Sequence, residues 1–152
     1  LGVVLLKKVR LIAVGKLIES YFRDASAEYA KRIGRFADLA IVEVPESPTE
    51  DTKAEAAAIE KQCKGYVILF DVEGEPLSSP EFSARLSRAY QTHDTVSLVI
   101  GSSRGVDDSI REKADCRVSF GKATFPHMLF RVMALEQLYR AFSIEQGGKY
   151  HK

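Results

Sequence analysis

The sequence has little that would support a disulfide framework or a metal centre. Its 152 residues include two cysteines and no tryptophan. The cysteines, Cys63 and Cys116, form no C-x-x-C pair, so we expect two reduced thiols in a reducing compartment, the cytoplasm. The three histidines, His93, His127 and His151, are scattered along the chain, which predicts no metal site.

Long apolar runs are also missing. No run approaches the roughly 20 residues that span a bilayer, so we expect no contact with membranes. Residues 1–6 are apolar, but charge follows them instead of a cleavage-type sequence, and we expect a disordered leader there. The length fits one domain over residues 1–152, with a genuine core.

A large excess of charge of one sign is absent as well. The 22 basic and 21 acidic residues leave a net charge of +1. This argues against a protein that coats nucleic acid by charge alone, because such binding relies on many phosphate contacts. A local basic patch or one specific RNA site is compatible with it.

Apolar runs alternate with helical patterns. Five apolar runs predict strands, at Val9–Val14, Leu39–Val44, Tyr66–Val72, Thr95–Ile100 and Cys116–Phe120. Helical spacing and helix-start signals predict helices at Leu17–Arg35, Thr52–Lys64, Ser78–Tyr90, Val106–Ala114 and Pro126–Glu145. We expect a turn at Glu73–Pro76. The alternation predicts a single-domain α/β fold with a mainly parallel sheet flanked by helices.

Three strand ends are candidate ligand sites, because open α/β sheets bind ligands beyond the carboxyl ends of their strands. They are Phe70–Gly74, Ile100–Gly105 and Phe120–His127. The second contains neither G-x-G-x-x-G nor the G-K-[ST] of a P-loop, and its glycines suit either a tight turn or close approach to a ligand. The third either reads an adenine edge with its backbone, with Phe120 and Phe125 as apolar contacts, or is a buried connection.

The last predicted helix is apolar almost all round, which is typical of a helix buried on several sides. We expect one side of it to pack against a second copy in a two-fold homodimer. His127 and Arg131 are four residues apart and share one face of this helix. A histidine at a helix start is most often structural, but an arginine one turn on, beside a ligand loop, favours a function for the pair.

The C-terminal part of the chain resembles a known family. It reads F-P-H-M-L-F-R-V-M-A-L-E-Q-L-Y-R-A-F-S-I over Phe125–Ile144 and G-x-x-Y-H over Gly147–His151. Both segments are similar to the SPOUT-class methyltransferases that modify N3 of a pseudouridine in large-subunit (23S) ribosomal RNA. The likeness extends to I-G-S-S-R-G at Ile100–Gly105 and R-L-I-A-V-G-K at Arg10–Lys16, and it covers nearly the whole chain after about Lys7.

The resemblance implies a SPOUT fold with a C-terminal trefoil knot, here at about residues 95–145, which is an exception to the rule that protein chains are unknotted. It implies S-adenosylmethionine (SAM) as the methyl donor, bound by three segments. On this chain those segments contain Phe70, Gly101, Phe120, Gly121, Lys122, Ala123, Thr124 and Phe125. It also implies a homodimer in which each site is completed by the partner's tail, and a substrate on the assembled ribosome.

Four residues are the candidate catalytic groups. His127 and His151 are candidates for the base that removes the N3 proton, or for orienting the acceptor, because imidazole titrates near neutrality. Arg131 is a candidate to hold negative charge on the uracil oxygens or to grip a phosphate. Tyr150 is a candidate to stack on the base.

Three residues depart from the family's usual pattern and keep other functions open. Ser102 replaces a glycine, Lys149 replaces a proline, and Phe70 stands where leucine is common. One alternative is a SPOUT methyltransferase that acts on another RNA, such as tRNA. The other is a ribosome-binding factor that has lost catalysis, which the changes at Ser102 and Phe70 favour slightly.

Overall fold

The computed structural model describes residues 6–151, which form strands and helices in the predicted alternating order. The strands are β1 (Lys7–Val14), β2 (Ala37–Val44), β3 (Tyr66–Pro76), β4 (Thr95–Ile100) and β5 (Cys116–Ser119). The helices are α1 (Ser20–Ile33), α2 (Thr52–Gln62), α3 (Ser79–Thr92), α4 (Asp108–Lys113) and α5 (His127–Glu145). Apart from Leu6, the leader predicted at residues 1–6 lies outside the described residues.

The five strands form one parallel sheet in the order β2-β1-β4-β3-β5. β4 is the central strand, and each of its residues is buried, as expected for a parallel sheet that helices cover on both faces. The predicted α/β fold with a parallel sheet flanked by helices is therefore confirmed. Because all strands point the same way, their carboxyl ends meet at one edge of the sheet.

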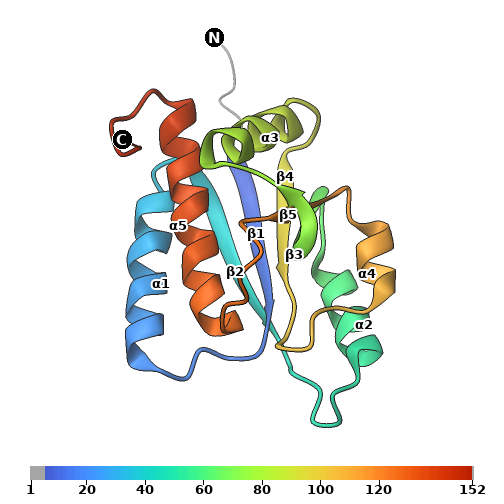
Figure 1. The fold of residues 1–152 in the computed structure, drawn as a ribbon. Helices are drawn as coiled ribbons and strands as arrows, with labels where there is room; N and C mark the ends of the chain where they lie inside the picture. Colours follow the sequence, from blue (N-terminus) through green and yellow to red (C-terminus); the bar gives the residue numbers. More distant parts are fainter. Residues whose placement is uncertain (1–5, 152) are drawn as a thin grey trace.

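Helices cover both faces of this sheet (Figure 1). On one face α1, α3 and α5 pack over strand residues such as Leu98, which meets Phe82 and Leu138 in the larger core cluster. On the other face α2 and α4 cover Val99, which belongs to a cluster with Ile59. None of the helices within residues 6–151 is long and apolar enough to cross a membrane.

The turn predicted at Glu73–Pro76 is wrong, because β3 continues through it. The pairing of β3 with β5 shifts register between Phe70 and Glu75, which marks a bulge. Gly74 allows the two backbones to approach, since a Cβ there would lie 2.7 Å from the carbonyl carbon of Arg117. The bulge leaves the residues directly after Phe70 without a β5 partner, at the edge where the strand-end loops gather.

Helix α1 begins at Ser20, three residues later than predicted. Before it, the backbone N–H of Leu17 donates to Glu43 Oε2 at 3.1 Å, and the side chain of Ile18 is 73% exposed. A tie to β2 thus replaces the first predicted turn of helix. The remaining boundaries, apart from the end of β3, differ from the predictions by at most two residues.

The side chain of Leu135 on α5 lies in the core of its own chain, where it is 1% exposed. We expect Leu135→Ala to lower the free energy of unfolding by about 2–5 kcal/mol, because it removes buried methyl groups and leaves a cavity. Urea denaturation followed by circular dichroism measures this loss. Val72→Ala, at a side chain that is 53% exposed, is the control. Equal losses in the two variants would contradict the core position of Leu135.

Candidate active site

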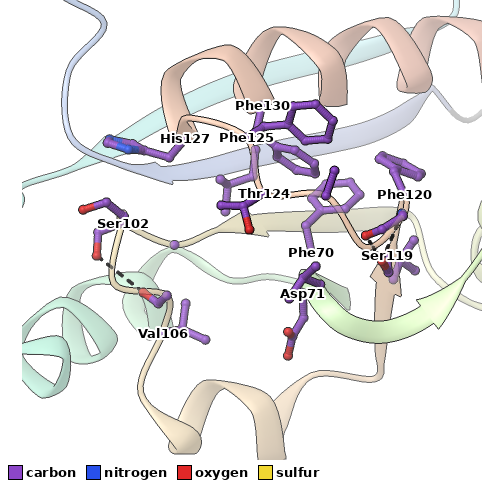
Figure 2. Close-up of a pocket in the computed structure, with 18 of the residues that line it drawn as sticks. Phe70, Asp71, Ser102, Val106, Ser119, Phe120, Thr124, Phe125, His127 and Phe130 are labelled. Atoms are coloured by element: carbon purple, nitrogen blue, oxygen red, sulfur yellow. Dashed lines mark hydrogen bonds between the residues drawn. The ribbon is translucent and has the colours of Figure 1, made fainter.

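A cavity of about 260 Å³ opens where the carboxyl ends of β3, β4 and β5 meet the start of α5. This is the edge at which open α/β sheets bind ligands. Figure 2 shows the turn after β4 on one side of the cavity and the loop after β5, with Thr124 and Phe125, on the other. All three strand ends that the sequence singled out therefore contribute to one site.

Aromatic side chains form one wall of the cavity (Figure 2). The ring centroid of Phe70 lies 5.2 Å from that of Phe120 and 5.4 Å from that of Phe130. Phe82 of α3 supports them from behind, with its centroid 5.4 Å from that of Phe120. These are favourable distances for tilted and edge-to-face aromatic pairs. The wall is thus a packed apolar surface against which a flat, apolar ring can lie.

The turn after β4 is held by its own polar groups. Ser102 is 8% exposed, and its Oγ accepts from the backbone N–H of Arg104 at 3.3 Å. The backbone N–H of Gly105 donates to the carbonyl oxygen of Ser102 at 2.9 Å. A Cβ on Gly101 would lie 2.6 Å from the oxygen of Gly105 and 2.7 Å from Val106 Cγ1. Gly101 is therefore needed by the close packing of the turn on the strand end.

The loop after β5 leaves its backbone groups free. Ser119 anchors its start, because Ser119 Oγ donates to the oxygen of Gly121 at 2.9 Å and accepts from the N–H of Gly121 at 3.1 Å. Residues 122–125 are exposed, and their backbone N–H and C=O groups have no hydrogen-bond partner among residues 6–151. The loop is thus an exposed loop rather than a buried connection, and it offers both donors and acceptors at the cavity.

A charged network forms the polar side of the cavity. Asp71, whose side chain is 8% exposed, accepts from Arg111 Nε at 3.2 Å. Arg111 Nη1 also donates to the carbonyl oxygen of Val106 at 3.1 Å. Sequence reasoning missed Arg111 and Phe130 as cavity residues, because each comes from a helix that no strand-end pattern marks. The network ties the end of β3 to the turn after β4.

Most of the predicted cofactor residues line the cavity. They are Phe70, Gly101, Phe120, Gly121, Ala123, Thr124 and Phe125. Lys122 is exposed on the same loop and does not line it. Of the four candidate catalytic residues, His127 alone lines it, and its buried Nε2 has no hydrogen-bond partner within residues 6–151.

Arg131 does not line the cavity. Its side chain is 2% exposed, Nη1 donates to the oxygen of Gly15 at 3.0 Å, and Nη2 donates to Glu43 Oε2 at 3.0 Å. A Cβ on Gly15 would lie 3.9 Å from Nε2 of His127. The guanidinium therefore clamps the start of α5, with His127, onto the ends of β1 and β2. Its role toward RNA stays a prediction.

Tyr150 and His151 lie along α5 away from the cavity. The hydroxyl of Tyr150 donates to Glu136 Oε2 at 3.1 Å, and the Arg140 guanidinium stacks 4.8 Å from its ring centroid. Arg140 Nη1 also donates to His151 Nδ1 at 2.9 Å. Glu136 and Arg140 follow His127 by nine and thirteen residues, which places them about 14 to 20 Å along the helix. The tail thus does not reach the cavity of its own chain.

Tyr150 also differs electrostatically from an ordinary tyrosine. Desolvation, together with the neighbouring Tyr29 and Glu136, raises the pKa of its phenol to about 12. The phenol is therefore neutral near pH 7 and acts as a hydrogen-bond donor rather than a base.

Among residues 6–151 there is no group of three or more potential metal ligands.

A parallel α/β domain with a partly apolar cavity at its carboxyl edge is a small-molecule-binding domain of the kind that carries nucleotide-like cofactors. Comparison with known proteins makes the class specific, since a family model described as a predicted SPOUT methyltransferase matches residues 7–151. The chain belongs to this family of methyltransferases, as the resemblance predicted.

Relatives from several bacteria match along nearly their whole length. Proteins of Leuconostoc citreum and Streptococcus suis, both named ribosomal RNA large subunit methyltransferase H, are 40% and 39% identical to this chain. Each match covers 95% of this chain and 99% of the relative. A third, from Caldicellulosiruptor saccharolyticus and of the same name, is 40% identical with the same coverage.

Solved structures share the fold at lower sequence identity. A probable methyltransferase of Bordetella pertussis is 17% identical, with a TM-score of 0.59 over 90% of this chain and 95% of that one. A probable methylase family protein of Haemophilus influenzae is 16% identical, with a TM-score of 0.57 over 95% of this chain and 70% of that one. Both comparisons support the fold alone.

Proposed function

We propose that this protein transfers a methyl group from SAM to N3 of a pseudouridine in 23S ribosomal RNA, on the assembled ribosome in the cytoplasm. One observation carries the proposal. The strand-end cavity, with its free loop backbone and unpartnered histidine, lies in a chain about 40% identical over 95% of its length to relatives named as large-subunit RNA methyltransferases.

The cavity residues fit SAM. The ring faces of Phe70 and Phe120 supply apolar contact for an adenine ring. The backbone N–H and C=O groups of residues 122–125, unpartnered within residues 6–151, match the donors and acceptors of an adenine edge. When bound, SAM supplies an electrophilic methyl group. The knot predicted at residues 95–145 remains part of this proposal.

The chain's own residues then have three tasks. The loop and the aromatic wall would hold the cofactor at the carboxyl edge of the sheet. We assign the N3 proton to His127, because it lines the cavity and its Nε2 has no hydrogen-bond partner within residues 6–151. Arg131 acts as a positioning residue, because its bonds to Gly15 and Glu43 hold the helix start that carries His127.

The protein acts as a homodimer in this proposal. Large apolar side chains are exposed around the neighbouring starts of α1 and α5, which lie at the same end of the molecule (Figure 1). They are Ile18, Tyr21, Phe125 and Leu129. An exposed apolar patch of this kind marks an interaction surface. Tyr150 and His151, which lie away from the cavity of their own chain, then complete the partner's site.

The dimer can be tested at Leu129, which is 36% exposed on α5. We expect Leu129→Asp to give a folded monomer, because the charge is solvated in the single chain but buried in the dimer. Sedimentation velocity measures the mass, and circular dichroism checks the fold. Glu145→Gln, at the opposite end of α5, is the control and stays dimeric. A Leu129→Asp protein that sediments as a dimer would contradict this interface.

The proposed function is tested by incubating the purified protein with labelled SAM and ribosomes from a strain that lacks the corresponding methylation. We expect label in 23S RNA, mapped by mass spectrometry to a methylated pseudouridine, and little label when free 23S RNA is the substrate. Bound SAM without label in large-subunit RNA would overturn the proposal.

Two alternatives remain distinguishable, one by the same assay and the other by calorimetry. Label in tRNA but not in ribosomes would favour a SPOUT methyltransferase with another RNA target. Failure to bind SAM at millimolar concentration in calorimetry would favour a ribosome-binding factor without catalysis. The packed aromatic wall around Phe70 and the well-bonded turn at Ser102 favour neither alternative, because both substitutions are accommodated without loss of the cavity.

A further inference from the structure

An exposed ion pair joins two loops at the carboxyl edge of the sheet. Arg104 of the turn after β4 pairs with Glu50 of the loop between β2 and α2. The two side chains are 54% and 56% exposed. Neighbours of Arg104 on both sides, Ser103 and Gly105, line the cavity, so the guanidinium stands beside its mouth.

The loop that carries Glu50 is built to present it. The backbone φ of Glu50 is +60°, a left-handed conformation that residues other than glycine seldom adopt. The N–H of Glu50 donates to the oxygen of Ser47 at 3.2 Å, and Ser47 Oγ accepts from the N–H of Asp51 at 3.1 Å. The N–H of Ser47 in turn donates to Glu55, which is 4% exposed on α2. A fixed loop therefore holds the carboxylate of Glu50 toward Arg104.

The turn that carries Arg104 is equally fixed at its backbone but not at its side chain. The backbone N–H of Arg104 is bonded to Ser102 Oγ, whereas the guanidinium has Glu50 as its one charged partner among residues 6–151. An exposed ion pair adds little stability, because water solvates both charges well. Exchange of the carboxylate for another anion is therefore energetically easy.

The anion that best fits this position is a phosphate of RNA. A guanidinium donates two parallel hydrogen bonds to the oxygens of a phosphate, as it does to those of a carboxylate. A phosphate can therefore take the place of the Glu50 carboxylate. Two more exposed cations, Lys16 and Lys122, stand beside the same edge and form no ion pair within residues 6–151. Two acids that follow the turn are already engaged: Asp107 caps α4, and Asp108 pairs with Arg111.

We propose that Arg104 binds a backbone phosphate of the RNA substrate at the mouth of the cavity, and that Glu50 occupies Arg104 until the RNA displaces it. The inference rests on the proposed function for the identity of the substrate. Glu50 acts as a competitor of the phosphate, so that weak contacts with other RNA do not suffice to release Arg104.

Binding of ribosomes at several salt concentrations tests this directly, measured with the fluorescently labelled protein and without reference to methylation. Arg104→Gln is expected to weaken binding and to lower the slope of log affinity against log salt by about one. Arg104→Lys keeps most of the slope. Glu50→Gln is expected to tighten binding by about two- to fivefold, since it removes the competing partner.

The double variant Glu50→Gln, Arg104→Gln separates competition from a general change in charge. It is expected to bind like Arg104→Gln alone, because Glu50 acts through Arg104. Glu60→Gln is the matched control, since Glu60 forms an exposed ion pair with Lys113 between α2 and α4 and changes the net charge equally. Glu60 follows Asp51 by nine residues, which places it about 14 Å along α2 from the loop that carries Glu50. This separation exceeds a Debye length of roughly 8 Å, so Glu60→Gln is expected to leave RNA binding unchanged.

Two results would overturn the proposal. One is an unchanged salt slope in Arg104→Gln while SAM binding stays intact. The other is weaker ribosome binding by Glu50→Gln, which would mean that the ion pair stabilises the loops and does not compete with RNA. These are binding measurements and do not depend on methylation. A wild-type protein that binds ribosomes without methylating them would contradict the proposed function, but the test of Arg104 and Glu50 would remain valid.

Discussion

Gly101→Val is expected to weaken SAM binding by roughly tenfold to a hundredfold. A Cβ at this position meets the oxygen of Gly105 at 2.6 Å and Val106 Cγ1 at 2.7 Å, and valine adds two methyl groups beyond it. The turn after β4 must then move away from the strand end, which deforms one side of the cavity. Overpacking of this kind costs about 1–3 kcal/mol, equivalent to roughly a tenfold to hundredfold loss of affinity.

Calorimetry with SAM measures the affinity, and thermal unfolding checks that the chain still folds. Gly101→Ala is the milder companion and is expected to bind more weakly than the wild type but better than Gly101→Val. Gly34→Ala is the control, because Gly34 lies after α1, has φ −56°, and a Cβ there lies no closer than 3.3 Å to another atom. Normal SAM affinity in a folded Gly101→Val protein would place the cofactor elsewhere.

Removal of Tyr150–Lys152 is expected to reduce methyl transfer by roughly fivefold to 150-fold, with little change in SAM affinity, since stacking on a base contributes about 1–3 kcal/mol. Within one chain, Tyr150 contacts Glu136 and Arg140 and leaves the cavity untouched. Within residues 6–151, Tyr150 and His151 therefore have no contact through which their loss would disturb the cavity residues of the same chain. Equal losses of activity and SAM affinity would mean that the tail is structural.

Mixing the two impaired proteins, at a SAM concentration that Gly101→Val binds poorly, shows which chain the tail serves. In a heterodimer of the tail-deleted chain and Gly101→Val, the intact cavity of one chain receives the intact tail of the other. Random exchange is expected to restore about a quarter of wild-type activity, because half the dimers are mixed and each has one complete site. Each protein mixed with itself is the control. No restoration, with exchange verified by mass, would show that each tail serves its own chain.

The local pattern of apolar residues predicted most of the strands and helices. Apolar runs such as Tyr66–Val72 predicted strands at the right places, because a strand buried on both faces needs continuous apolar character. The bulge of β3 was missed, since Glu73–Pro76 has turn-like composition and its pairing with β5 is a contact between distant segments. Gly74 could have indicated the bulge, because a glycine within a strand often marks the close approach of another backbone.

The same limit applies to the site. Residues near the predicted strand ends, such as Phe70 and Phe120, were predictable because parallel strands bring their carboxyl ends to one edge. Arg111 and Phe130 were not, because they reach the cavity from α4 and α5 through packing that sequence spacing does not encode. His127 and Arg131 share a helix face, yet Arg131 is turned to Gly15, directly after β1, and to Glu43 of β2.

By itself, the sequence determined the order of strands and helices, the strand ends that line the cavity and, through the Phe125–His151 segment, the family. These properties depend on neighbouring residues, whose spacing sets burial and turn geometry. Tertiary structure alone decided that Gly101 is required by its own turn, that Arg131 clamps a helix, and that Tyr150 lies far from the cavity of its chain. Arg131 joins segments distant in sequence, and the packing of the sheet and its helices determines that they meet. Gly101 and Tyr150 depend on how the turn and the tail fold back on nearer residues, which spacing alone does not determine.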